Sequence, residues 1–90
     1  MKKIVITVVG KDCMGIIAKV CTYLSEIKVN ILDISQTIVQ DYFNMMMIVD
    51  INKSEKDIIT ISEDLEVMGK EIGVIVRVQS EEIFDMMHRI

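Results

Sequence analysis

The chain has 90 residues, of which 51% are hydrophobic, and it contains no proline or tryptophan. Its net charge of −4 and the lack of a basic stripe argue against nucleic-acid binding. No apolar run reaches the length of a membrane span and the start does not resemble a signal peptide, so we expect one small cytoplasmic domain. Its apolar content exceeds what one small core needs and favours a homo-oligomer.

A β-branched strand, a turn with two glycines and an amphipathic helix open the chain. The strand is expected over residues 3–9 and the helix over residues 13–27, where apolar side chains recur every three or four positions. Gly10 is expected to reverse the chain through a positive φ, Asp12 to cap the helix, and Gly15 to leave space at its first turn. Because the first amides of a helix attract anions, this turn is the best ligand-site candidate.

The cysteines and the histidine do not form a chemical site. Cys13 and Cys21 lack metal-ligand spacing, and the single His88 is far from both. A structural zinc site needs about four ligands, so we expect neither a metal nor a cofactor. Cys21 falls on the apolar helix stripe and is expected in the core. Cys13 has no neighbouring base, so we expect no catalytic residue and no enzyme.

Two alternating strands follow, over residues 31–40 and 43–51. The second strand is expected to bury Met45 and Met47, because methionine fills irregular gaps in a core. In the first strand, Gln36 falls among apolar positions and is interpreted as an interface residue, because a buried amide needs partners. The apolar residues expected to share its face are Leu32, Ile34 and Ile38.

The remaining segments predict a second helix, a fourth strand and a third, shorter helix. Ser54 is expected to cap the second helix and Gly73 to end it. The strand is expected over residues 74–79, and a C-terminal helix over residues 81–90 is expected to pack on the domain or on a dimer partner. The apolar stripe of the second helix is Ile58, Ile61, Leu65, Met68 and Ile72.

The resulting βαββαβ order predicts an α+β fold of the ferredoxin-like type. Such a sandwich places two helices on one face of a four-stranded antiparallel sheet, here with the short C-terminal helix added. The helix-free face is mixed, because Met46, Ile48 and Ile75 share it with polar side chains. The C-terminal helix or another subunit could cover that face.

The run Gly10-Lys11-Asp12-Cys13-Met14-Gly15-Ile16, followed by Asn30-Ile31, resembles the ACT domain family. The chain is most similar to small stand-alone bacterial members of an uncharacterised subgroup. The resemblance implies an ACT domain over residues 1–80, with residues 81–90 as the C-terminal helix. One departure is that the family often has Arg-Pro before the second glycine, where this chain has Cys13-Met14.

The resemblance implies a non-catalytic regulatory domain that binds an amino acid or a similar small metabolite at a homodimer interface. Amides at the helix start would receive a carboxylate, and Asp12 would pair with an α-ammonium group. Asn30 offers both a donor and an acceptor. The ligand-binding residues implied are Gly10, Asp12, Met14, Gly15, Ile16, Asn30 and Ile31.

Each of these residues also has a structural interpretation. The glycines serve turns and packing, Asp12 caps a helix, and Asn30 can hold a left-handed conformation at a helix end. The alternative function is a ligand-free interaction module that dimerises or binds a protein partner through the open sheet face. The turn lacks the arginine of an acylphosphatase-like enzyme and the second cysteine of a metallochaperone, and the sheet lacks the aromatics of an RNA-binding surface.

Overall fold

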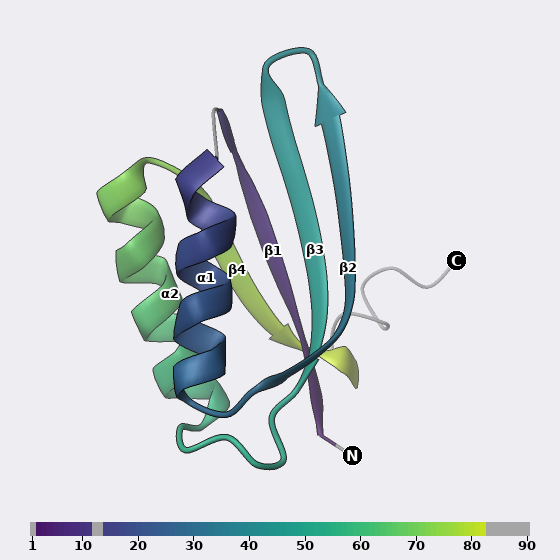
Figure 1. The fold of residues 1–90 in the computed structure, drawn as a ribbon, viewed down its shortest axis with the longest axis vertical. Helices are drawn as coiled ribbons and strands as arrows, with labels where there is room; N and C mark the ends of the chain where they lie inside the picture. The colour runs from purple at the N-terminus through teal and green to yellow at the C-terminus, as the bar shows by residue number, and fades with distance from the viewer. Residues whose placement is uncertain (1, 12–13, 83–90) are drawn as a thin grey trace.

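The fold is a four-stranded antiparallel sheet with two helices, seen in a computed structural model that describes residues 2–11 and 14–82 (Figure 1). The strand order is β2-β3-β1-β4. The predicted βαββαβ order is confirmed, whereas the predicted C-terminal helix lies almost wholly outside the described residues. The elements are β1 (Lys3–Lys11), α1 (Met14–Glu26), β2 (Asn30–Val39), β3 (Tyr42–Asp50), α2 (Ile58–Ile72) and β4 (Ile75–Ser80).

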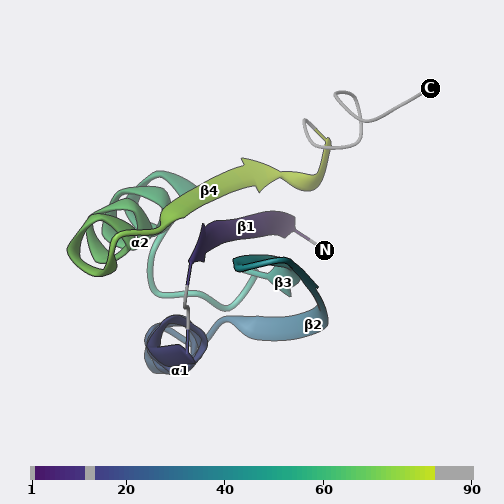
Figure 2. The same ribbon diagram turned by 90° about the horizontal axis from the view of Figure 1, so that it is seen from above.

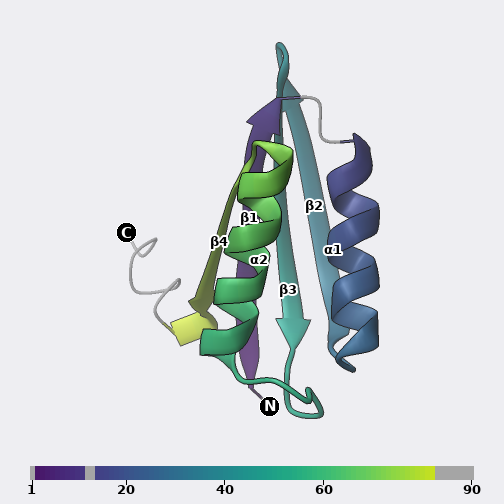
Figure 3. The ribbon, with the colours of Figure 1, turned by 90° about the vertical axis from the view of Figure 1, so that its left-hand side faces the viewer.

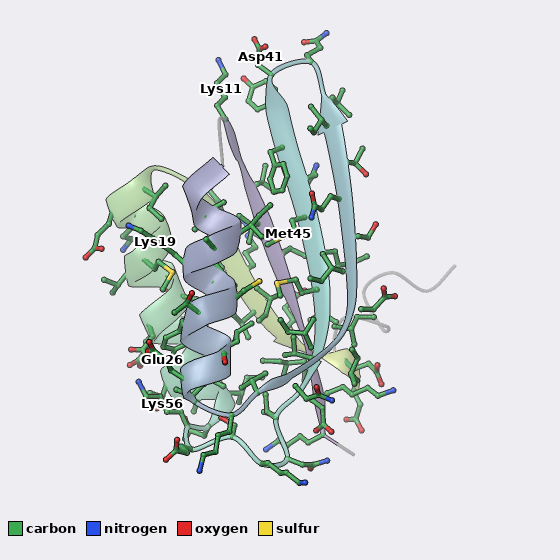
Figure 4. The ribbon with its side chains drawn as sticks, viewed as in Figure 1. Lys11, Lys19, Glu26, Asp41, Met45 and Lys56 are labelled. Carbon is green, nitrogen blue, oxygen red and sulfur yellow. The ribbon has the colours of Figure 1, made fainter. Side chains whose placement is uncertain are left out.

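Both helices lie on the same side of the twisted sheet, as the view from above shows (Figure 2). The core fills the space between these two layers. Met45 lies between β3 and α1 (Figure 4), and both Met45 and Met47 are buried, as the alternation of this strand predicts. Among the described residues, the fully buried side chains are Ile4, Ile6, Val8, Ile16, Val20, Leu24, Met45, Met47, Val49, Ile61 and Leu65.

Helix α2 is closed at both ends by local hydrogen bonds. Asp57, rather than the predicted Ser54, is the N-cap, and its carboxylate accepts from the Thr60 amide at 2.9 Å. The Ser54 hydroxyl instead closes a local turn, in which it accepts from the Lys56 amide at 3.1 Å. Gly73 ends the helix at φ 90°, as predicted. These two caps fix the residues at which α2 begins and ends.

Strand β2 departs from the alternation that its sequence predicts. Its pairing with β3 shifts between Ile31 and Asp33, so one extra residue enters β2 at this bulge. Ile31, not Leu32, consequently packs against the core. Leu32, which is expected to share a face with Ile34, is the residue of the bulge that has no partner on β3, and it is exposed.

Most of β2 is not covered by any other element among the described residues. Nine of its ten residues are exposed, and Ile31 alone is half-buried. The β2–β3 hairpin also extends past the start of α1, at the end of the molecule where Lys11 and Asp41 lie (Figures 3 and 4). The sheet therefore presents a long open edge. The exposed apolar residues of this strand are Leu32, Ile34, Ile38 and Val39.

Candidate functional site

Gly10 serves close packing rather than a chain reversal. It lies inside β1 and pairs with Phe43, and the positive φ values among the described residues belong to Lys28, Gln40 and Gly73. A Cβ on Gly10 would lie 2.5 Å from Cγ1 of Val74. The predicted reversal at Gly10 is wrong, because the strand continues to Lys11 and the approach of Val74 is what requires glycine.

Gly15 leaves open space at the first turn of α1. It is exposed, and a Cβ built on it would meet no atom within 4 Å. The next residue, Ile16, is fully buried in the core. Asp12 lies outside the described residues, as does the side chain of Met14. The described part of the turn therefore offers backbone groups and free volume.

Gly15 lies in the first turn of α1, whereas Asn30 and Ile31 open β2, which begins beyond the other end of α1 (Figure 1). Helix α1 has 13 residues and separates them by about 20 Å. Asn30 opens β2 opposite Asp50 in extended conformation, so the left-handed conformation considered for it is found at Lys28 instead (φ 64°). A single copy of the chain therefore does not bring the two halves of the predicted site together.

Gln36 has the exposure expected of an interface residue. It pairs with Met45, whose side chain is in the core, so Gln36 points to the helix side of the sheet. It nevertheless remains exposed, because neither helix reaches over β2. Ile34 and Ile38 share its face and are 38% and 72% exposed. An open strip with one amide between two isoleucines thus runs along the sheet edge.

A polar cluster of Tyr23, Lys56 and Asp64 links the two helices. The Tyr23 hydroxyl donates to the Asp64 carboxylate at 2.5 Å, and the Lys56 ammonium donates to the same carboxylate at 2.8 Å. Lys56 also lies 5.3 Å from the centre of the Tyr23 ring. No sequence pattern predicts this cluster, because Tyr23 and Asp64 are 41 residues apart.

The cluster shifts two titrations in opposite directions. Burial raises the pKa of the Tyr23 hydroxyl, and its hydrogen bond to Asp64 adds to that rise. The hydrogen bond from Lys56 lowers the pKa of Asp64, and the one from Tyr23 acts in the same direction. Asp64 is therefore ionised and Tyr23 neutral over the physiological range. The carboxylate can then pair with Lys56 and accept the hydrogen bond that the Tyr23 hydroxyl donates.

The described residues show neither a metal site nor a membrane helix. Within residues 2–11 and 14–82, no three His, Cys, Asp or Glu side chains are grouped closely enough to hold a metal ion. No helix there is long and apolar enough to cross a bilayer. Cys21 is unpaired and packs partly against the core, in agreement with its place on the apolar stripe.

Comparison with known proteins agrees with this fold. A relative from Bifidobacterium longum, a UPF0237 protein, is 60% identical over 90 residues and covers all of both chains. Another UPF0237 protein, from Methanocaldococcus jannaschii, is 48% identical, again over all of both chains. An ACT domain protein from Streptococcus pneumoniae of known structure superposes with a TM-score of 0.80 at 39% identity, covering 93% of this chain and 94% of that one.

A family model described as an ACT domain matches residues 2–79. ACT domains are regulatory domains that bind small ligands. The match confirms the resemblance carried by the glycine turn and by Asn30-Ile31, and the chain belongs to the ACT domain family.

Proposed function

We propose that the chain is a non-catalytic regulatory domain that acts as a cytoplasmic homodimer and binds an amino acid or a similar small metabolite at the dimer interface. The observation that carries this proposal is the separation of Gly15 from Asn30 across the length of α1. Residues that serve one ligand have to meet, and in this fold they can meet between two copies.

The exposed edge of β2 is suited to pairing with a second copy. It carries a single charged residue, Asp33, and no proline, and its bulge lies near its start, so the strand beyond Asp33 lacks the features that usually protect an edge. Its apolar side chains would be covered by such a contact. Two β2 strands related by a two-fold axis run antiparallel, which places Asn30 of one copy beside Val39 of the other.

This pairing would complete the ligand site. Val39 lies at the end of the sheet where the β1–α1 turn is found (Figure 1). Asn30 and Ile31 of one copy would therefore approach Gly10 and Gly15 of the other. A ligand carboxylate would receive amides at the start of α1, and the Asn30 amide would supply one donor and one acceptor. Asp12 would pair with the ligand's ammonium group.

A thermal-shift screen against the twenty amino acids and common metabolites tests the proposal. A ligand present at about one hundred times its dissociation constant adds about 2.7 kcal/mol to the free energy of unfolding. We expect one chemical class to raise the melting temperature, and Asp12→Ala and Asn30→Ala each to abolish that rise while remaining folded. A response that survives both substitutions would contradict the proposed site.

Mixed dimers test whether the site is shared between two copies. Asn30→Ala and Gly15→Val each damage both sites of their own homodimer. A dimer formed from one copy of each variant would hold one intact site and one doubly damaged site. Calorimetric titration should therefore find one working site in each mixed dimer, half the number in a wild-type dimer. If mixing restores no binding, the site is built within one chain.

A second candidate is the ligand-free interaction module, and one observation favours it. Val9 and Ile75 are paired neighbours on the helix-free face and are 38% and 60% exposed. An apolar patch of this kind marks a protein contact. If no metabolite shifts the melting temperature and Ile75→Glu disrupts assembly, this module would replace the ligand-binding domain as the preferred function.

A further inference from the structure

A groove runs between α1 and α2 on the outer surface of the molecule. The two helices run in opposite directions with the sheet behind them (Figures 1 and 3). The groove has a volume of about 560 Å³ and lies away from the β2 edge and from the β1–α1 turn. Its lining includes the apolar Ala18, Val67 and Met68, called here the floor, with Thr22 beside them, and the charged Lys19, Glu26 and Glu71, called here the rim.

The lower end of the groove has a fixed geometry. There the Tyr23 hydroxyl and the Lys56 ammonium both bind the Asp64 carboxylate, and both Tyr23 and Asp64 also line the groove. Because Tyr23 belongs to α1 and Asp64 to α2, their hydrogen bond joins the two helices at this end of the groove. Val67 lies one turn along α2 from Asp64 and is 56% exposed. A large apolar side chain is thus presented to solvent in a preformed depression.

The charges around the groove are predominantly acidic. Glu26 and Glu71 flank it, and Asp64 is the carboxylate already paired with Lys56. Lys19 is the basic residue of its rim (Figure 4). On the outer surface of α2, Glu63 adds a further carboxylate, while Glu66 lies 3.6 Å from Lys70. The surface therefore combines an apolar floor with an excess of negative charge.

We propose that this groove binds an amphipathic helical segment of another protein, one that presents apolar side chains flanked by lysine or arginine. Apolar residues on one stripe of the segment would fill the floor at Val67 and Met68, as in helix-in-groove recognition. Its basic residues would pair with Glu26 and Glu71. A second copy of this chain is disfavoured as the occupant, because its helices would bring acidic residues against acidic residues.

Two model peptides of about 14 residues test the charge requirement. Both carry leucine at helical positions i, i+3, i+4 and i+7, one with flanking lysines and the other with flanking glutamates. Amide shifts in NMR titrations locate binding. We expect the basic peptide to shift Thr22, Val67 and Glu71, and the acidic peptide to leave them unchanged. Equal binding of both peptides, or shifts elsewhere only, would overturn the proposal.

A matched pair of variants tests the location. Val67→Lys places a charge in the groove, whereas Ile59→Lys changes an equally exposed apolar residue of α2 outside it (65% exposed). We expect Val67→Lys to weaken the basic peptide by at least about tenfold and Ile59→Lys to have no effect. Equal weakening by both variants would overturn the proposal, as would binding unchanged by either one. A rise in molecular mass through this surface would identify a second copy as the occupant and also overturn it.

Discussion

The two edges of the sheet, β4 and β2, are built differently. At the β4 edge, α2 lies so close that a Cβ on Gly69 would be 2.8 Å from the Val74 carbonyl oxygen and 2.9 Å from Val76 Cγ2. At the β2 edge neither helix covers the strand, and Ile38 is 72% exposed. Covering a strand with a helix is one way in which a chain protects a sheet edge. Helix α2 packs closely on β4, whereas β2 has no such cover among the described residues.

The largest expected effect concerns assembly. Ile34 lies near the middle of β2, where a two-fold axis between paired strands would pass, so Ile34→Glu would place two like charges close together and convert the dimer into monomers. The matched control is Ile75→Glu, which changes an exposed isoleucine of β4. Sedimentation velocity should show a fall in mass for Ile34→Glu alone. Equal masses for both variants would contradict the proposal that the copies meet at the β2 edge.

Packing at the β4 edge should tolerate no added methyl group. Gly69→Ala puts its Cβ against backbone and should destabilise the domain by about 1–3 kcal/mol. Gly15→Ala is the control, because the space around Gly15 is open and alanine favours a helix. Chemical denaturation compares the two. A stable Gly69→Ala variant would mean that α2 and β4 are less tightly packed than described.

The contact between the helices should contribute a smaller amount. Tyr23→Phe removes the hydroxyl that donates to Asp64 and keeps the ring, so we expect a loss of about 1 kcal/mol in the free energy of unfolding. The measurement is urea denaturation of both proteins at neutral pH. An unchanged midpoint would show that the hydrogen bond from Tyr23 to Asp64 adds no net stability.

The smallest effect is a dependence of stability on pH. The pKa of Asp57 is lowered by the Thr60 amide and that of Asp64 by Lys56. Unfolding returns each pKa to its ordinary value, so the unfolded state binds more protons and stability falls as the pH drops below about 4. Asp57→Asn keeps a capping side chain but removes one titration, so its melting temperature should fall less on acidification. Parallel curves would contradict this role of Asp57.

The sequence predicts the fold well because the spacing of apolar residues indicates which of them face the core. Alternation places Met45 and Met47 in the core, and the stripe through Ile61 and Leu65 positions α2. It fails where one local interaction competes with another of similar strength. Ser54 and Asp57 are both good caps, and the structure uses the one whose carboxylate reaches the Thr60 amide. The bulge near Leu32 likewise leaves no mark in the alternation.

The sequence predicts which residues form the candidate site, but it does not predict where they lie in the fold. The motif joins Gly10, Gly15 and Asn30 along the chain, whereas the fold separates Asn30 from the two glycines by the length of α1. No pattern in a single chain reports a contact between two chains. The role of Gly10 was also hidden, because its neighbour Val74 is distant in sequence.

Paramagnetic relaxation between two copies tests the central claim most directly. One copy carries a spin label at Asn30→Cys, and the other is unlabelled but enriched in nitrogen-15, with Cys13→Ser and Cys21→Ser in both. We predict that the label broadens the amide signals of Gly10 and Gly15 of the enriched copy, because antiparallel β2 strands bring these groups together. Broadening confined to the helix-free face around Ile75, or none in a confirmed dimer, would contradict a shared site at the β2 edge.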